Sequence, residues 1–337
     1  MKDHGSPRIL LVKLSSFGDV LHALPTLEAL RAAYPQSHIT WLVETAYAPL
    51  LAGHPALDEV WPVPRVRWGQ KVSGIELLNL LRLLRRVRAA KFDLVIDLQG
   101  LLKSAMWVAL ARSDRKVGYD RTRELSYLAL TERIPPYDAE AHAVWRYLHV
   151  ARRLGAPPAL PRFRLGLKPA LPEFLVGLDR PLVALHPGAR WTTKIWPPTS
   201  WAKLADWLIQ EKGMSVVITG SSTDRDLTAR ITARMREKAL NLAGRTTLPE
   251  LAGILQKARV AITADTGPMH LAAALGTKVV GIFGPTAPGR TGPFGAGHRV
   301  VRLGMECSPC FQRHCQNPRC LIELTTEAVQ AVVEKSL

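Results

Sequence analysis

A turn that leads into a helix at residues 263–276 has the composition of a phosphate-binding site. A strand-like run ends there, and an Ala- and Leu-rich helix follows with Pro at its first position. Between them the chain places Asp265 and Thr266, which are capping types, and Gly267, which lets a ligand approach the backbone. Because the first amides of a helix lack partners and carry partial positive charge, we expect a phosphate or diphosphate there, with His270 facing the same mouth. The alternative is an ordinary capped helix of an α/β domain.

A second polar loop follows the strand-like run that ends at His186. Its Thr192, Thr193 and Lys194 supply two hydroxyl groups and a cation just before a helix that we expect to begin near Pro198. These three side chains suit a diphosphate whose negative charge grows as it leaves. The alternative is a turn with one solvated lysine.

A third loop, Gly220–Asp224, ends another strand-like run of the same half. Its Asp224 can hydrogen-bond a ribose, and it can equally cap the next helix. The chain holds neither a G-x-G-x-x-G nor a G-x-x-x-x-G-K-[ST] pattern. This absence argues against a dinucleotide oxidoreductase and against a P-loop nucleoside triphosphatase.

In the first half of the chain, a polar loop at Lys13–Asp19 follows the first apolar run. A carboxylate at a helix N-terminus is a common cap, so Asp19 has a structural explanation. However, Gly18 before it lets a second molecule approach, and a carboxylate there could take a proton from an attacking hydroxyl group. Both roles of Asp19, cap and general base, remain open at this point.

All four cysteines of the chain fall in one C-x2-C-x4-C-x4-C array, which is formed by Cys307, Cys310, Cys315 and Cys320. The first pair suits a tetrahedral structural zinc, and His314 could replace one sulfur. The other spacings are tighter than in most zinc ribbons, so reduced thiols without a metal are the alternative. Disulfides are not expected, because they are rare in cytosolic proteins.

The formal net charge of +17 over 337 residues indicates an anionic partner, and the alternative is a generally basic protein whose charges only solvate it. A nucleic acid, an anionic membrane surface and an acidic substrate all meet this requirement. We find no nucleic-acid-binding motif, so an anionic substrate or lipid surface is favoured. The predicted helix Gly74–Ala90 carries Arg82, Arg85, Arg86 and Arg88 opposite its apolar side, which fits a solvated face or, less often, a membrane surface. No apolar run is long enough to span a bilayer and none resembles a signal peptide, so we expect a cytosolic protein.

The elements that must position these loops alternate between strand and helix. In the first half we expect strands at Arg8–Lys13, His38–Val43 and Asp93–Leu98, and a helix from Asp19 to Tyr34 that Pro25 kinks or delays. A proline-rich stretch from Gly155 to Pro181 indicates an interdomain connection.

The second half repeats the alternation. We expect strands at Leu182–His186, Ser215–Thr219, Val260–Thr263 and Lys278–Phe283, and helices at Thr199–Lys212, Asp224–Glu237, Leu248–Lys257, Pro268–Leu275 and Thr325–Lys335. Two successive βαβ arrays predict two parallel sheets covered by helices, with ligands at the carboxyl ends of the strands. The predicted domains are residues 1–168, residues 169–324 and a C-terminal helix at 325–337.

At this point the chain resembles a known family, the ADP-heptose:lipopolysaccharide heptosyltransferases of glycosyltransferase family 9. The resemblance depends on five blocks that lie in order along the chain: residues 13–25, 95–105, 192–194, 265–276 and 283–286. The first two blocks look more like heptosyltransferase I, which adds heptose to Kdo on lipid A, than like heptosyltransferase II. The cysteine array departs from the type I pattern and is similar to clusters in other members of the family.

The resemblance implies an α/β protein of the GT-B fold, in which two Rossmann-like domains face an interdomain cleft, and an inverting transfer of heptose from ADP-heptose. It implies that Asp19 is the general base. It also implies that the donor diphosphate is bound by Thr193, Lys194 and the amides of Thr266 and Gly267, with Thr192 beside them and Lys194 acting in catalysis. Asp265 and His270 would lie close to the heptose. Asp224 matches a position where the family usually has the longer glutamate that grips the ribose.

For the acceptor, the resemblance implies contacts from the segments that hold Ser15, Ser16, Gly18, Arg67 and Arg123. The implied acceptor is Kdo-lipid A or inner-core lipopolysaccharide, whose carboxylates and phosphates suit the basic chain. The enzyme would need no catalytic metal and would bind no nucleic acid, and it would work peripherally on the cytoplasmic face of the inner membrane. Alternatives are heptosyltransferase II or III, a GT-B nucleotide-sugar epimerase that uses no large acceptor, and a non-catalytic module that coats anionic lipid.

Overall fold

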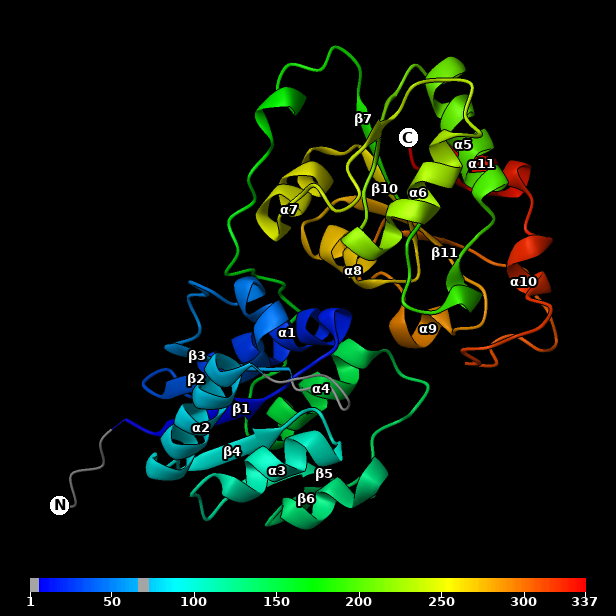
Figure 1. Ribbon diagram of the computed structural model, residues 1–337. Helices are drawn as coiled ribbons and strands as arrows, with labels where there is room; N and C mark the ends of the chain where they lie inside the picture. Colours follow the sequence, from blue (N-terminus) through cyan, green and yellow to red (C-terminus); the bar gives the residue numbers. More distant parts are fainter. Residues whose placement is uncertain (1–5, 66–72) are drawn as a thin grey trace. The chain divides into compact units, whose positions relative to one another are not determined.

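A computed structural model describes residues 6–65 and 73–337 of the chain. The chain divides into two compact units, Met1–Leu167 and Lys168–Leu337 (Figure 1). Each unit is built on its own six-stranded parallel sheet. The prediction of two parallel sheets covered by helices is therefore confirmed.

Unit 1 has the strand order β3-β2-β1-β4-β5-β6. Its strands are β1 (Arg8–Val12), β2 (His38–Glu44), β3 (Glu59–Val63), β4 (Leu94–Asp97), β5 (Lys116–Tyr119) and β6 (Glu132–Ile134). Its helices are α1 (Phe17–Ala33), α2 (Gly74–Ala89), α3 (Leu102–Leu110) and α4 (Ala143–Arg153), with 3₁₀ turns η1 (Thr45–Leu50) and η2 (Arg123–Ala129).

The helices of unit 1 cover both faces of the sheet. The connections through α1 and α2 cross the sheet in opposite directions, so right-handed crossovers place these two helices on opposite faces. Consistent with this, α4 packs on α1. On the other face, Leu83 and Val87 of α2 share one core with Trp107 of α3 and with Leu10 and Val12 of β1.

Unit 2 has the strand order β12-β11-β10-β7-β8-β9. Its strands are β7 (Leu182–His186), β8 (Ser215–Ile218), β9 (Leu240–Asn241), β10 (Val260–Ala264), β11 (Lys278–Ile282) and β12 (Arg299–Val301). Its helices are α5 (Pro198–Gln210), α6 (Arg225–Thr232), α7 (Leu248–Lys257), α8 (Gly267–Ala274), α9 (Pro288–Thr291), α10 (Arg319–Ile322) and α11 (Thr326–Glu334), with 3₁₀ turns η3 (Glu173–Leu175), η4 (Thr192–Lys194) and η5 (Ser222–Asp224).

The core of unit 2 is rich in tryptophan. Trp196 and Trp201 are fully buried and lie edge to face, with ring centroids 5.3 Å apart. The indole N–H of Trp196 donates to the carbonyl of Leu324 at 2.9 Å, which fixes the chain just before α11. Helix α11 then packs against α5 and β12 through the buried Val329 and Val333.

Two sequence expectations for helices are corrected. Helix α1 begins at Phe17 and runs through Pro25, so a late start is wrong; the buried face around Leu21 and Leu24 outweighs the backbone hydrogen bond that proline cannot make. Helix α6 ends at Thr232 rather than near Glu237, because the amides beyond it turn away to donate to the Asp206 carboxylate. The sequence analysis also did not identify the short strands β3, β5, β6, β9 and β12.

Candidate active site

In unit 1, Asp19 lies in the first turn of α1, directly after the carboxyl end of β1. One carboxylate oxygen, Oδ2, accepts from the amide of Ser16 at 3.1 Å and from its hydroxyl group at 2.8 Å. The other oxygen, Oδ1, accepts from the hydroxyl group of Tyr147 on α4 at 2.9 Å. Asp19 is half-buried, so it serves the capping role and still has access to solvent.

A buried cation supports this carboxylate. Lys13, which is 2% exposed, donates from Nζ to the Tyr147 hydroxyl group at 2.8 Å and to the Leu98 carbonyl at 3.2 Å. Burial by itself would raise the pKa of Asp19. The positive charge of Lys13 and the hydrogen bonds from Ser16 outweigh this effect and hold the pKa well below its usual range. Burial raises the pKa of Tyr147 well above its usual value, as does the nearby charge of Asp19. Tyr147 thus stays a hydrogen-bond donor and Asp19 stays ionised.

A second ionic group lies beside this carboxylate. Ser15 accepts a hydrogen bond at its hydroxyl group from Lys103 of α3, and its amide donates to Gln99 at 3.0 Å. Lys103 also pairs with Glu44 at the end of β2, at 2.7 Å, and Arg65 lies 3.9 Å from the other Glu44 oxygen. Lys103 and Arg65, which follow β4 and β3, thus share one acid, Glu44, and the positive charge left over can attract an anionic ligand.

The remaining predicted acceptor residues are placed as follows. Gly18 is buried in the first turn of α1. Arg123 is exposed at the start of η2, a segment held to the start of α3 by the Leu102 amide, which donates to Glu124 at 2.9 Å. Arg67 lies outside the described residues.

In unit 2, Lys194 and Asp265 form a direct ion pair. Lys194 Nζ lies 2.6 Å from Asp265 Oδ2, which also accepts from the Thr286 hydroxyl group at 2.6 Å. The two partners come from the loops after β7 and β10, and these strands are neighbours, with Thr263 opposite His186. The Asp265 side chain is only 5% exposed and that of Lys194 is 16% exposed, so a buried carboxylate fixes a partly buried lysine.

The start of α8 lies beside this pair in the chain. Thr266 is its N-cap in an extended conformation and Gly267 is its first residue, so their amides have no carbonyl of a preceding turn to bond. Pro268 follows, as the sequence predicted. His270 is buried one turn further along the helix. This helix start and Lys194 are the parts of unit 2 suited to an anion.

The Asp224 carboxylate accepts local hydrogen bonds from Ser221. Its Oδ2 accepts from the amide of Ser221 at 2.7 Å and from the Ser221 hydroxyl group at 2.6 Å. A Cβ atom built on Gly188 would lie 2.4 Å from Asp224 Oδ1, so the absence of a side chain at Gly188 makes room for this carboxylate. Asp224 therefore lies against the loop after β7.

His186 at the end of β7 is buried beneath the same loop. Its Nδ1 lies 2.9 Å from the hydroxyl group of Thr219, which itself donates to the Leu185 carbonyl at 3.1 Å. The Thr219 oxygen must then accept from His186, which assigns the proton of the neutral ring to Nδ1. Burial lowers the pKa of His186 to about 4, although the charge of Asp224 opposes the shift.

The cysteine-rich segment contacts the Lys194 loop and the loop that holds Thr286. Thr193 is buried and its hydroxyl group donates to the Gln312 carbonyl at 2.9 Å, whereas Thr192 is exposed. The guanidinium of Arg313 lies 5.1 Å from the centroid of the Trp191 ring, and the Phe311 amide donates to the Pro285 carbonyl at 2.8 Å. Residues 307–320 therefore support both the Lys194 loop and the Thr286 loop.

The four cysteines are reduced, with Cys307, Cys310 and Cys315 exposed and Cys320 half-buried. Burial raises the pKa of the Cys320 thiol, and the charges of the other three sulfurs raise it further. No group of three or more His, Cys, Asp or Glu side chains in residues 6–65 and 73–337 is placed to hold a metal ion.

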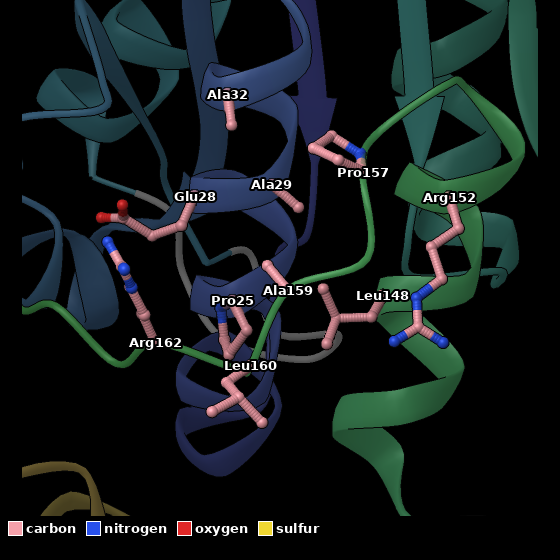
Figure 2. Close-up of a pocket in the computed structure, with 10 residues that line it drawn as sticks. All are labelled: Pro25, Glu28, Ala29, Ala32, Leu148, Arg152, Pro157, Ala159, Leu160 and Arg162. Atoms are coloured by element: carbon pink, nitrogen blue, oxygen red, sulfur yellow. The ribbon is translucent and has the colours of Figure 1, made fainter.

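Unit 1 also holds a cavity of about 250 Å³ away from the predicted site residues. It lies between α1, α4 and the chain at 157–162, and apolar side chains such as Leu148 and Leu160 form much of its wall (Figure 2). The charged groups Glu28, Arg152 and Arg162 stand at its edge. None of the residues predicted from the sequence lines this cavity.

Several residues of the site were not predicted from the sequence. Tyr147 contacts Asp19 from 128 positions away, and no local pattern marks it. Thr286 lies in the 283–286 block that the sequence analysis singled out, and Lys13 begins the 13–25 block, so a signal for both existed. Lys103 lies in the 95–105 block, although its pairing with Glu44 required the sheet order.

Comparison with known proteins shows which family this chain is similar to. Residues 80–321 match the model of glycosyltransferase family 9 (heptosyltransferase). The chain is 34% identical over 313 residues to lipopolysaccharide heptosyltransferase 1 of Pseudomonas aeruginosa, a match that covers 91% of this chain and 87% of the relative.

Among solved structures, the chain resembles the Escherichia coli heptosyltransferase WaaC with ADP, at 27% identity and a TM-score of 0.80, over 98% of this chain and 100% of that one. The same enzyme with ADP-2-deoxy-2-fluoro heptose gives a TM-score of 0.77 at the same identity and coverage. These matches confirm the predicted GT-B fold.

Proposed function

The chain belongs to glycosyltransferase family 9, the heptosyltransferases, and from this premise we propose that it transfers heptose from ADP-heptose to Kdo of the lipopolysaccharide inner core. The observation that carries the proposal is the match of nearly the whole chain to a heptosyltransferase solved with ADP. The geometry of both units supports it. Unit 1 offers an ionised carboxylate, and unit 2 offers a fixed cation next to a helix start.

The reaction is written as one displacement with inversion. The acceptor hydroxyl group gives its proton to the Asp19 carboxylate, and its oxygen bonds to the anomeric carbon of heptose as the bond from that carbon to the diphosphate oxygen breaks. ADP leaves with the electron pair. The low pKa of Asp19 keeps it ionised before the reaction, so proton transfer is favoured only as the nucleophile's oxygen loses electron density to the new bond.

Leaving-group stabilisation falls to unit 2 in this proposal. Lys194, with the amides of Thr266 and Gly267, binds the diphosphate as its charge grows, and the Asp265 carboxylate holds the lysine in place. Thr192 adds an exposed hydroxyl group. The Thr193 hydroxyl hydrogen is donated to the Gln312 carbonyl, so in this proposal Thr193 meets the diphosphate through its amide.

The rest of the donor and the acceptor are assigned as follows. His270 and Asp265 lie near the heptose, and Asp224 reaches the ribose through the oxygen that does not cap Ser221. Kdo-lipid A or inner-core lipopolysaccharide, both anionic, would meet Ser15, Ser16, Gly18, Arg67 and Arg123.

The direct test is incubation of the protein with ADP-heptose and a Kdo-terminated lipid A acceptor, followed by mass analysis. The proposal expects an acceptor heavier by one heptose and an equal amount of ADP. An acceptor that already carries the first heptose is the matched control. Transfer to that control alone would assign the protein to another subtype, and conversion of the donor without transfer to either would indicate an epimerase.

We also propose a structural Zn²⁺ at the four cysteines, supported by their C-x2-C-x4-C-x4-C spacing in a segment that contacts the Lys194 loop. Metal content measured on protein purified without chelator should be one zinc per chain. Chelation should lower the melting temperature while the chemistry persists. A metal-free preparation with an unchanged melting curve would contradict the proposal.

Finally, we propose that the protein works as a peripheral protein at the cytoplasmic face of the inner membrane, where a lipid-linked acceptor is available. No helix in the part of the chain that the structure describes has the length and apolar character to cross a membrane. The basic net charge supports attraction to an anionic surface.

A further inference from the structure

Large apolar side chains are exposed together on one face of unit 1. They come from three neighbouring elements, α2, α3 and η2, of which α3 packs against both of the others. We call this surface the α2–α3–η2 face, and its members are Ile75, Leu77, Leu78 and Leu81 of α2, Leu102 and Met106 of α3, and Leu125 and Leu128 of η2. Large exposed apolar patches mark interaction sites.

Helix α2 shows the exposure most clearly. Every residue from Ser73 to Asn79 is exposed, and Ile75 is 73% exposed. Leu83 and Val87 are buried, and Leu80 and Leu84 are partly buried against the core, so the later turns hold the helix on the sheet most firmly. Burying an apolar side chain of this size is worth about 1.5–3 kcal/mol, and Ile75, Leu77 and Leu78 gain at most part of it within unit 1. The exposed apolar side chains at the start of α2 therefore indicate that a partner covers them.

The charges around the face identify its partner. Arg82, Arg85 and Arg88 are exposed, and within the described residues none of them forms an ion pair. Arg86 pairs with Glu59 and lies over the Trp61 ring. An apolar helix end followed by a cluster of arginines is the pattern of helices that lie in the interface of an anionic bilayer.

A second copy of the chain fits this face less well. In a two-fold dimer the same patch meets itself, so the arginines of one copy would approach those of the other. Each copy also carries a formal charge of +17. An anionic lipid surface instead accepts the leucines among its acyl chains and the arginines among its phosphates.

We propose that the α2–α3–η2 face docks the protein on an anionic bilayer by inserting its apolar side chains into the interface. This proposal rests on the proposed function, since it names the surface that brings the enzyme to a lipid-linked acceptor. The face adjoins the carboxyl edge of the sheet. Its helix α3 carries Lys103, which contacts Ser15, and its turn η2 begins at Arg123. An acceptor anchored in the same bilayer would thus present its sugar to the edge that holds Asp19.

The test is co-sedimentation of the full chain with vesicles of phosphatidylglycerol and phosphatidylcholine, compared with vesicles of phosphatidylcholine alone. The parent protein should bind only the anionic vesicles, and binding should weaken as salt rises. The Ile75→Ser/Leu78→Ser variant should bind at least tenfold more weakly. Arg82→Ser/Arg85→Ser should lose roughly fivefold per arginine, given the contribution of one basic side chain at such a surface.

A matched control removes exposed apolar side chains elsewhere. Leu160 and Phe174 are 85% and 60% exposed in the connecting stretch, outside the face. The Leu160→Ser/Phe174→Ser variant should bind vesicles as the parent does. Equal binding by the parent and the Ile75→Ser/Leu78→Ser variant would overturn the proposal, as would a parent dimer in sedimentation velocity that this variant abolishes.

Failure of the docking proposal is distinguishable from failure of the proposed function. Transfer to a water-soluble Kdo acceptor without acyl chains should be the same in the parent and in both face variants, whereas transfer to an acceptor within anionic vesicles should fall with binding. If the parent transfers no heptose but still binds vesicles through Ile75 and Leu78, the function is wrong and the docking face stands. Vesicle transfer that is unaffected by loss of the face would refute docking alone.

Discussion

The two units hold a lysine and an aspartate in opposite arrangements. In unit 1 the lysine is buried and the carboxylate of Asp19 is half-buried, with Tyr147 bridging them. In unit 2 the carboxylate of Asp265 is buried and Lys194 is partly buried, in direct contact at 2.6 Å. In each pair the more buried partner fixes the less buried one. Unit 1 therefore presents an anion and unit 2 presents a cation, which suits a base and a leaving-group site respectively.

Removing the anion of unit 1, the Asp19 carboxylate, should have the largest effect on the rate of transfer. Asp19→Asn keeps the size of the side chain and can still accept from Ser16, so we expect α1 to form. Loss of a general base costs about 10²- to 10⁴-fold in rate. The rate constant of transfer should fall by this factor, measured as heptose added per enzyme, while ADP binding by calorimetry should stay at the parent value.

A near-parent rate of the Asp19→Asn protein would contradict the base assignment. Unchanged melting of the variant is the required control, because Asp19 also caps α1. Weaker ADP binding together with slow transfer would indicate a folding defect rather than lost proton transfer.

Removing the cation of unit 2 is expected to have the next largest effect. Lys194→Met removes the cation from the buried Asp265 carboxylate, which keeps its hydrogen bond from the Thr286 hydroxyl group. We expect transfer to slow by roughly 10²-fold, as for other lost groups that stabilise developing charge, and ADP to bind more weakly. Breaking such a pair also costs about 3–5 kcal/mol of stability.

A double variant separates these two consequences of Lys194→Met. Lys194→Met/Asp265→Asn removes the uncompensated charge, so most of the lost stability should return while transfer stays slow. Kinetics and thermal melting of the parent, the single variant and the double variant make the comparison. Parent-like ADP affinity in the single variant would show that this cation does not meet the diphosphate.

The two site carboxylates were foreseeable because each follows an apolar strand and precedes a helix. Such local signals also located β7 and α7, whose bounds match the expected ranges. The arrangement that distinguishes the two pairs was not foreseeable. Tyr147 reaches Asp19 only because α4 packs on α1, and Thr193 turns to Gln312 only because residues 307–320 fold back onto its loop. Contacts of that kind depend on tertiary packing, which carries no fixed sequence spacing.

The remaining assignments stay predictions for a similar reason. The sequence placed Asp224 equally well as a ribose ligand and as a cap, and the structure shows the capping hydrogen bonds. Short edge strands such as β9, with two residues, carry too little apolar periodicity to be recognised. The role of Arg123 depends on an acceptor that the fold alone does not identify.

A pH experiment sharpens the comparison, because a buried imidazole lies in unit 2. The pKa of His186 falls to about 4 by burial, against about 6.5 in the unfolded chain. Between these values the unfolded state binds more protons, so stability falls as pH falls. We expect a loss of about 2 kcal/mol from pH 7.5 to pH 5 at this residue. His186→Asn should lose less stability over that interval in thermal melting, and an equal loss in parent and variant would contradict the assignment.

The smallest expected effect concerns the bridge in unit 1. Tyr147→Phe removes the hydrogen bond to Asp19 Oδ1 and the acceptor of Lys13 Nζ, while the ring stays in place. A hydrogen bond to a charged group favours the charged form, so its loss should raise the pKa of Asp19 and move the acid limb of the pH–rate profile to higher pH. Because the carboxylate also loses a group that orients it, we expect roughly a tenfold loss of rate, about 1.4 kcal/mol, and an unchanged KM for ADP-heptose.

Tyr119→Phe is the matched control for this bridge. Tyr119 is also partly buried and donates to the Arg146 carbonyl on α4, but it does not contact Asp19. Its loss should leave the pH–rate profile unmoved, because no proton of the Asp19 carboxylate depends on it. A profile shift shared by both variants would mean that α4 as a whole positions the carboxylate. A shift confined to Tyr147→Phe would mean that the buried lysine acts on Asp19 through this one hydroxyl group, whereas the lysine of unit 2 needs no such intermediary.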